Sequence, residues 1–175
     1  GARGRYRLDM TGDTDYGPLS ADLILGTSGP TRLDIQRANL SGVDFTGSLV
    51  QTRAGPFAGS LRGNGNGLAG VVTLAAAGRY QSADFHLRSS GTSFEGPANL
   101  SIGYAIIDGR AVLYDRPEVI AKVQLADTRY GAFFINAMRA DIDYRAGRGR
   151  AKALVEGRSE VPFRIALNAQ MEPRL

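Results

Sequence analysis

Side chains that could perform chemistry are few in this chain. Its 175 residues include no cysteine, no tryptophan and one histidine, His86. Without cysteine the chain has no thiolate nucleophile, no disulfide and no cysteine-based zinc site. One histidine cannot supply a site that needs two or three imidazoles. These counts exclude several classes of enzyme and metal protein.

The remaining candidate catalytic groups lack the partners that catalysis needs. Asp84 and Arg88 flank His86 at two-residue spacing, but a general base also needs a nucleophile or a second partner within reach. Asp141 and Asp143 could act as the acid and base of a glycosidase, although on a strand this spacing is more typical of a solvent-facing side. We predict that the chain is not an enzyme and uses no cofactor.

A glycine-rich stretch, GNGLAG at 65–70, fits the G-x-G-x-x-G pattern of dinucleotide-binding loops. Such a loop must open a helix and needs an acidic residue about 20 positions later. The next residues, 71–74, are rich in β-branched side chains, and the first acidic residue, Asp84, comes too early. We interpret this stretch as a glycine-rich strand and turn, where glycine permits close approach of the backbone.

A second stretch weakly resembles a calcium-binding loop. Asp13 and Asp15 precede Gly17, but the twelfth position of such a loop should be glutamate and is Ile24 here. We therefore expect a solvated turn and no metal site.

Charge and hydropathy narrow the class of protein further. The net charge is +4, and 19 of the 21 basic residues are arginines that are scattered along the chain. Arg3, Arg5 and Arg7 are locally dense, but Tyr6 falls on the opposite face of that strand, so the pattern does not favour nucleic-acid binding. No run of 18 apolar residues is present and no signal peptide opens the chain. We expect one segment, residues 1–175, cut from a longer protein.

Alternation of apolar and polar residues is the main structural pattern. It recurs in at least eight runs and predicts strands with one apolar and one polar face. The apolar positions of these runs are Tyr6, Leu8 and Met10; Leu33 and Ile35; Val43, Phe45 and Leu49; Phe85 and Leu87; Leu100, Ile102 and Tyr104; Val119, Ala121, Val123 and Leu125; Ala140, Ile142 and Tyr144; and Val161, Phe163, Ile165, Leu167 and Ala169.

Turn residues separate the runs at a spacing typical of all-β chains. Turns are predicted at 11–13, 17–18, 28–30, 54–56, 90–91, 96–97, 108–109 and 147–149. Two hairpins follow, one across Asp108-Gly109 and one across 147–149. The only candidate helix is a short piece at 131–138. The prediction is an all-β antiparallel meander without a domain boundary.

The apolar face is unusual because many of its residues are small. Aromatic residues make up 8% of the chain, and a β-sandwich of this size normally fills its core with larger side chains. The face could be a core, or the lining of an open groove whose small residues leave room for a ligand. The predicted lining residues are Val43, Phe45, Leu49, Leu74, Phe85, Leu87, Leu100, Ile102, Val123, Leu125, Ile142, Val155, Phe163, Ile165 and Leu167.

Four stretches together resemble the TamB family of the AsmA-like superfamily, especially its alphaproteobacterial members. They are FAGSLRGNGNGL (57–68), VQLADTRYG (123–131), ADIDYRAGRG (140–149) and VPFRIALNA (161–169). The likeness spans roughly residues 40–172. It implies an open, taco-like curved sheet with an apolar interior that runs along the stacked strands.

The resemblance also implies a function and a location. TamB-like proteins are periplasmic, are anchored in the inner membrane by an N-terminal helix outside this segment, and are implicated in phospholipid transport between the inner and outer membranes. They are also implicated in outer-membrane protein assembly with a BAM-like barrel of the TamA type. The expected partners are phospholipid acyl chains and, through the full-length protein, that barrel. No nucleic acid is expected.

An alternative function remains open from the residues themselves. A structural or adhesive β-solenoid, such as the passenger domain of an exported protein, would also be all-β and would bind no ligand. It predicts parallel coils around a filled interior, whereas the hairpin signals favour antiparallel strands. Exposed end strands would also allow two copies of the segment to form an edge-to-edge dimer.

Overall fold

The computed structural model describes residues 4–14, 17–94 and 99–172, and consists of one sheet. Its first six strands are β1 (Arg5–Thr14), β2 (Gly17–Gly26), β3 (Arg32–Leu40), β4 (Val43–Gln51), β5 (Phe57–Gly65) and β6 (Leu68–Ala77). The next six are β7 (Tyr80–Phe94), β8 (Leu100–Val112), β9 (Glu118–Tyr130), β10 (Phe133–Arg145), β11 (Arg148–Arg158) and β12 (Pro162–Met171).

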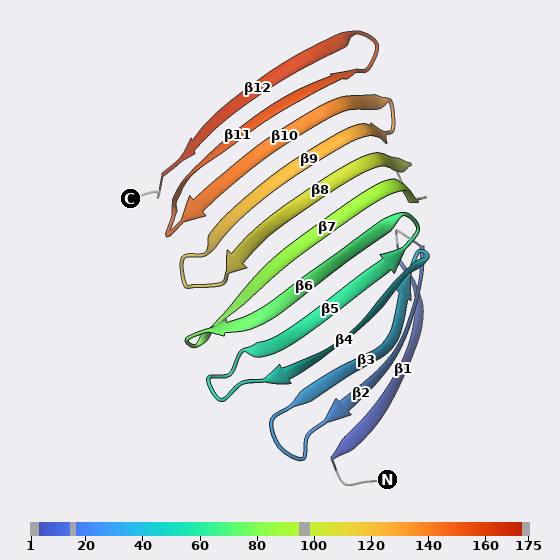
Figure 1. The fold of residues 1–175 in the computed structure, drawn as a ribbon, viewed down its shortest axis with the longest axis vertical. Coiled ribbons are helices and arrows are strands. Elements are labelled where there is room, and N and C mark those ends of the chain that lie inside the picture. The colour runs from blue at the N-terminus through green and yellow to red at the C-terminus, as the bar shows by residue number, and fades with distance from the viewer. Residues whose placement is uncertain (1–3, 15–16, 95–98, 173–175) are drawn as a thin grey trace.

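Each strand pairs antiparallel with the next one along the chain, so the sheet is a meander from β1 to β12 (Figure 1). Strands account for 81% of the chain, and the sheet is not closed into a barrel. The predicted all-β antiparallel meander is confirmed. At about 4.8 Å between strands, the stack is about 50 Å long.

The sheet is a single layer with little interior. Among the described residues the buried apolar side chains are Val43, Leu49, Ala105, Val112, Ala121 and Ala140, and half of these are alanines. The solvent-accessible area is 11675 Å², whereas a compact protein of 18.6 kDa would expose about 8,200 Å². Globular domains pack at least two layers of secondary structure around a core. The described residues of this chain form only one layer.

Bulges bend the sheet at two places. On β3, Ile35 and Ala38 face Gly47 and Phe45 of β4, so the β3 strand carries an extra residue. On β10 the register against β11 shifts between Ile135 and Ala137. A bulge increases local twist and bends the strand that carries it.

A line of irregular pairing also crosses three central strands near one of their ends, at Gly91 of β7, Gly103 of β8 and Asp127 of β9. Gly91 and Asp127 have positive φ angles of 72° and 49°. The Ser89 and Thr92 hydroxyls are hydrogen-bonded, which requires residues three apart in one strand to share a face. The alternation therefore skips one residue at this line.

Several predicted turns are confirmed. Residues 28–30 and 54–56 lie between strands, and the hairpin predicted across 147–149 joins β10 to β11, with Ala146 and Gly147 as its two turn residues at φ 53° and 87°. The turn predicted at 17–18 is wrong, because Gly17 and Pro18 are the first residues of β2. The turn predicted at 96–97 lies outside the described residues.

Other local predictions are wrong. Asp108-Gly109 lies inside β8, residues 11–13 lie inside β1, and residues 90–91 lie inside β7. The candidate helix at 131–138 is a turn followed by β10. Tyr104 points away from the apolar face, because the line of irregular pairing passes between it and Ile102. No helix that is long and apolar enough to cross a bilayer occurs in the described residues.

Candidate functional site

Strand register places one apolar side chain beside another from β1 to β12. In the C-terminal half, one continuous row is Leu87, Ile107, Val123, Ala140, Ala153 and Leu167. In the N-terminal half, another row is Leu8, Leu23, Ile35, Gly47, Leu61 and Val72. Directly paired residues lie on the same side of a sheet. We call this side the apolar face.

All fifteen residues predicted to line a groove lie on the apolar face. The placement of Ile102 and Leu100 depends on the irregular line, beyond which Ile102 pairs with Thr92 and Thr128. Further large residues belong to the same face and were not included in that prediction, among them Leu19, Leu23, Leu25, Leu61, Leu68 and Ile107. The alternation that identified the others was present at these positions too.

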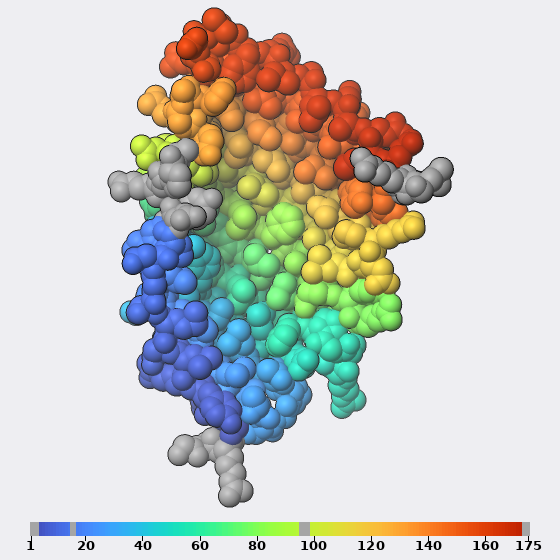
Figure 2. All heavy atoms as spheres, turned by 180° about the vertical axis from the view of Figure 1, so that it is seen from behind, coloured from blue at the N-terminus to red at the C-terminus, as the bar shows by residue number. Residues whose placement is uncertain are grey.

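The apolar face is the concave side of the sheet. Seen from behind, the molecule is hollowed over its central strands, with β1 (blue) along one side and β12 (red) across the upper end (Figure 2). Side chains converge on the inside of a curved sheet and spread apart on its outside. Accordingly Ala105, Ala121 and Ala140 of the apolar face are only 5–8% exposed, whereas Ala69 and Ala166 of the opposite face are exposed.

Large side chains lie over glycines of the neighbouring strand. Phe45 pairs with Gly63 and Phe85 pairs with Gly109. A Cβ built at Gly63 would stand 2.9 Å from Cε1 of Phe45, and one at Gly109 would stand 2.5 Å from Cζ of Phe85. The same arrangement recurs for Phe163 over Gly157, at 2.8 Å.

The sequence had suggested that small residues leave room for a ligand, but the space above these three glycines is occupied by a neighbouring ring. The missing side chains let the rings of Phe45, Phe85 and Phe163 cover the backbone of the neighbouring strand. Leu87 covers Gly70 in the same way. Any ligand would lie on top of these side chains, within the hollow that the curvature makes.

Three hydroxyl side chains of the apolar face are almost fully buried. Ser89, Thr92 and Thr128 are 4%, 0% and 4% exposed. Ser89 and Thr92 bond each other, and the Thr128 hydroxyl donates to the Ala126 carbonyl over 3.3 Å. Because these groups are satisfied within the sheet, they offer little to a polar ligand.

The opposite face carries the charges. Arg7 pairs with Asp22 at 2.5 Å, Arg164 with Glu156 at 3.1 Å, and Arg32 with Asp34 at 2.9 Å. These pairs lie at the surface and each contributes little to stability. The two sides of the sheet thus differ sharply, with hydrocarbon on the concave side and ion pairs on the convex side.

His86 belongs to this polar face. Its Nδ1 lies 2.8 Å from Oδ1 of Asp108, its partner across β7 and β8, and Arg88 lies 3.6 Å from the same carboxylate. The hydrogen bond from His86 and the charge of Arg88 lower the pKa of Asp108 below its ordinary value. All three groups are substantially exposed, so they form a surface ion-pair cluster.

The other motifs fall in ordinary structural positions. Gly65 ends β5 and Leu68 begins β6, with Asn66 and Gly67 at positive φ as the hairpin turn. This two-residue turn is typical of a hairpin, and no helix opens there as a phosphate loop requires. Within the described residues, no three His, Asp or Glu side chains come together as a metal site; Asp13 is in β1 and Asp15 lies outside them.

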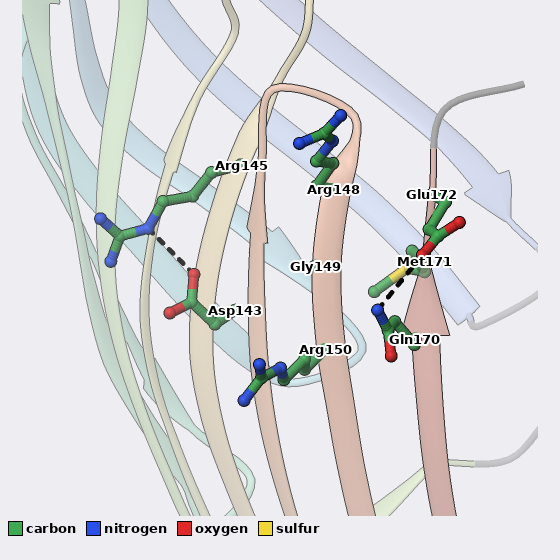
Figure 3. A pocket seen from close by; sticks show the side chains of 8 residues that line it. All are labelled: Asp143, Arg145, Arg148, Gly149, Arg150, Gln170, Met171 and Glu172. Carbon is green, nitrogen blue, oxygen red and sulfur yellow. Dashed lines mark hydrogen bonds and ion pairs between the residues drawn. The ribbon is translucent and has the colours of Figure 1, made fainter. Parts of the chain in front are cut away.

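A surface hollow at the β10–β11 turn is lined by several charged side chains. Arg145, Arg148 and Arg150 line it together with Asp143 and Glu172. Figure 3 shows the three guanidinium groups pointing in different directions, with Arg145 bonded to Asp143 at 2.9 Å. They do not converge on one point, as arginines that bind one phosphate would.

Comparison of the chain with protein-family models, curated proteins and solved structures found no significant match. The comparisons therefore do not identify a family. The resemblance to TamB remains an expectation from the sequence.

Proposed function

We propose that the apolar face binds the acyl chains of lipids, and that this chain is a segment of a TamB-like periplasmic bridge that passes phospholipids between the inner and outer membranes. The observation that carries the proposal is the continuity of the apolar face, which crosses all twelve strands from one open edge of the sheet to the other. In this proposal the chain acts without catalysis.

The chemistry of the face favours hydrocarbon over other ligands. Its buried hydroxyls already have partners, and the ion pairs lie on the other side of the sheet. A polar ligand placed here would lose its hydrogen bonds to water and gain none in return. An acyl chain has no hydrogen bonds to lose.

The magnitude of the available stabilisation is large enough for lipid binding. The molecule exposes roughly 3,400 Å² more surface than a compact protein of its mass. Shielding an acyl chain of about 16 methylenes at about 0.8 kcal/mol each is worth on the order of 10 kcal/mol. That offsets much of the cost of taking one chain out of a bilayer.

The continuity of the apolar face also favours a path along which lipid moves, instead of a single binding pocket. The rows of paired side chains have no charged residue between β1 and β12. An acyl chain could therefore move from strand to strand without meeting an electrostatic barrier. Its headgroup would remain in water at the open side of the hollow. In the full-length protein, the resemblance adds an inner-membrane anchor and a TamA-type barrel as the partner.

A structural sheet without ligand is the second candidate function. The parallel coils that a solenoid would require are not present, because every strand pair is antiparallel. A ligand-free sheet would nevertheless have to cover its apolar face in some other way. Lipid binding distinguishes the two candidates.

The test uses a pair of isoleucines that are adjacent in β8 and lie on opposite faces. Ile107 pairs with Leu87 and Val123 on the apolar face, whereas Ile106 pairs with Arg88 and Gln124 on the polar face. The protein is mixed with phosphatidylglycerol that carries a nitroxide on its acyl chain, and the immobilised fraction is measured by electron paramagnetic resonance. We expect Ile107→Asp to reduce that fraction severalfold and Ile106→Asp to leave it near the wild-type value.

Lipid extraction and mass spectrometry of the purified protein give a second readout. Co-purified phospholipid that is lost in Ile107→Asp would support the proposal. A wild-type protein that neither carries lipid nor immobilises the labelled lipid would contradict it, and would favour the structural sheet.

A further inference from the structure

Arginines recur at the turns along one side of the sheet. Alternate turns of a meander lie on the same side, and those that follow β2, β4, β6, β8 and β10 lie along the left side of Figure 1. Each of these five turns contains an arginine or adjoins one at the end of a strand. We call this set the arginine rim, and its members are Arg32, Arg53, Arg79, Arg116, Arg145 and Arg148.

The opposite side of the sheet has no such row within the described residues. Its described turns and the strand residues that flank them are 40–43, 65–68, 130–133 and 158–162. They contain one arginine, Arg158, and one carboxylate, Glu160. The Arg158 guanidinium lies over the ring of Phe134, 5.1 Å from its centre. Positive charge is therefore concentrated on one side of the hollow, although the arginines are scattered along the sequence.

Half of the arginine rim has no ion-pair partner. The other three members contact aspartates, as Arg32 does with Asp34, Arg79 with Asp115 and Arg145 with Asp143. Within the part of the chain that the structure describes, Arg53, Arg116 and Arg148 form no ion pair, and all three are exposed. Each of them therefore keeps a full charge and five hydrogen-bond donors available to an anion.

We propose that the arginine rim binds the phosphates of anionic phospholipids whose acyl chains lie on the apolar face. The inference rests on the proposed function, to which it adds the class of lipid and the side of the hollow where headgroups lie. A guanidinium is always charged and donates two parallel hydrogen bonds to phosphate oxygens. Turns on the same side are two strands apart, about 10 Å, so successive arginines contact successive headgroups and need not converge on one.

The arginine rim lies where the apolar face meets water. Val119 and Tyr144 pair with each other on the apolar face. Val119 is three residues after Arg116, and Tyr144 is four residues before Arg148. A lipid whose acyl chain covers the ends of these strands would therefore have its phosphate beside the turns.

The β8–β9 turn combines the charge of Arg116 with exposed apolar side chains. Leu113 and Tyr114 are 61% and 37% exposed, and the Tyr114 ring packs edge-on against Tyr80 with ring centres 5.1 Å apart. Tyrosine has an apolar ring and a polar end, and it is enriched where hydrocarbon meets water. A free phosphate would gain nothing from these side chains, so the combination favours a phospholipid.

The arginine rim favours anionic over zwitterionic lipids. Phosphatidylglycerol carries one net negative charge, at its phosphate. Phosphatidylcholine carries the same phosphate together with a quaternary ammonium, which arginines repel. The row extends from the turn after β2 to the turn after β10, a distance of about 40 Å at the usual strand spacing. A groove bordered by charge of one sign raises the local concentration of the opposite charge, so anionic lipid is favoured along this whole length.

The test removes the three unpaired charges and compares two lipids. Full chains of wild type and of the triple variant Arg53→Gln/Arg116→Gln/Arg148→Gln are mixed with phosphatidylglycerol or phosphatidylcholine that carries the same nitroxide on its acyl chain. The immobilised fraction is measured by electron paramagnetic resonance. We expect wild type to bind phosphatidylglycerol about 3- to 10-fold more tightly than phosphatidylcholine. The triple variant should bind both lipids at the wild-type level for phosphatidylcholine.

Two controls separate the position of the charges from the net charge. The variant Arg37→Gln/Arg62→Gln/Arg139→Gln removes the same charge from exposed arginines within strands of the polar face, and it should keep the preference for phosphatidylglycerol. Lysine at all three rim positions (Arg53→Lys/Arg116→Lys/Arg148→Lys) preserves the charge and should retain most of the preference.

The outcomes separate this inference from the proposed function. A wild-type protein that binds both lipids equally, or a rim variant that keeps the preference, would overturn the inference and leave acyl-chain binding in place. So would a polar-face variant that loses the preference as fully as the rim variant, or a rim variant that weakens binding of both lipids alike. A wild-type protein that immobilises neither lipid would overturn the proposed function, and this inference with it.

Quenching at the two sides of the sheet locates the headgroup. Because the chain has no cysteine, Ala54→Cys and Ala132→Cys each give a unique site for a fluorophore. Both alanines are exposed turn residues, Ala54 beside Arg53 and Ala132 in the β9–β10 turn on the opposite side. Phosphatidylglycerol with a nitroxide near the headgroup end of its acyl chain should quench the label at position 54 severalfold more than the label at 132. Equal quenching, or stronger quenching at 132, would contradict the inference.

Discussion

The ring of Phe85 on β7 lies over Gly109 on β8, so closely that a Cβ at Gly109 would stand 2.5 Å from its Cζ atom. The two residues are direct partners across the ladder. A large side chain opposite a glycine is the repeating unit of the apolar face, since Phe45 and Phe163 have the same arrangement with Gly63 and Gly157.

The first prediction follows from this packing. Gly109→Ala would force the Phe85 ring out of place and should lower the free energy of unfolding by about 1–3 kcal/mol. Gly12→Ala is the matched control, because Gly12 is also inside a strand but has nothing within 4 Å of a built Cβ. It should be neutral or slightly stabilising. Urea denaturation measures both.

A Cβ at Gly109 would also lie 2.8 Å from the Ile120 carbonyl oxygen. A second variant therefore distinguishes the clash with the Phe85 ring from the clash with this carbonyl. If the ring is the main obstacle, Phe85→Leu should recover part of the stability lost in Gly109→Ala. Equal stability of wild type and Gly109→Ala would show that the ring does not hold this position.

The buried hydroxyl pair gives another prediction. Thr92→Val removes the hydrogen bond to Ser89 and leaves a buried hydroxyl without that partner. The free energy of unfolding should fall by about 1–2 kcal/mol. The neighbouring exposed residue allows a control, since Ser93→Ala should change it by less than about 0.5 kcal/mol. A Thr92→Val protein as stable as wild type would mean that the irregular line does not depend on this contact.

The cluster around His86 predicts a titration. His86→Ala should raise the pKa of Asp108 toward its ordinary value, because the His86 hydrogen bond is the main cause of its lowering. Carboxyl carbon shifts in NMR measure this. Arg88→Ala should have the smaller effect. No change in the Asp108 pKa in His86→Ala would place its cause elsewhere.

The sign of the linked stability effect follows. The pKa of Asp108 is lower in the folded state, so its contribution to stability is present above the ordinary aspartate pKa. The contribution is lost as the pH falls through the lowered, folded-state pKa. Because the pair is exposed and screened by water, we expect only a small loss of stability on acidification, and it should be smaller still in His86→Ala.

Charge on the apolar face should affect binding more than folding. Leu125 lies on the apolar face beside Met138 and Ala105. If Leu125 faces an open hollow, Leu125→Asp should unfold at a urea concentration close to that of Gln124→Asp, its polar-face neighbour. Binding of labelled phospholipid should fall severalfold in the first variant only. A Leu125→Asp chain that fails to fold would identify this position as core.

Much of the fold was predictable because alternation reports directly on which side of a sheet a residue occupies. Along β9 the apolar positions from Val119 to Leu125, and along β12 those from Phe163 to Ala169, were predicted from spacing alone, and they lie on one face. The prediction from alternation was wrong for Tyr104, because the alternation skips one residue at Gly103. Nothing in the neighbouring sequence indicates this irregularity. The prediction failed again at residues 133–135, where the run of three apolar residues arises because Phe134 lies on the polar face beside Arg158, its partner on β11, while Phe133 and Ile135 lie on the apolar face.

Glycine was the other source of error. Asp108-Gly109 has the composition of a hairpin turn, yet Gly109 is required inside β8 by a ring that is 24 residues away in sequence. The concave side of the sheet was also hidden from the sequence, because curvature arises from bulges and from packing among strands. Only the structure shows that the apolar residues share the inner side.

The most direct test of the central proposal asks where a bound lipid lies. Cysteines at Ile107 and Ile106, adjacent residues of β8 on opposite faces, each carry an environment-sensitive fluorophore. Phosphatidylglycerol with a nitroxide on its acyl chain is then added. The proposal predicts strong quenching and a blue shift at position 107 with little change at position 106. Equal quenching at both positions, or none at 107, would contradict it.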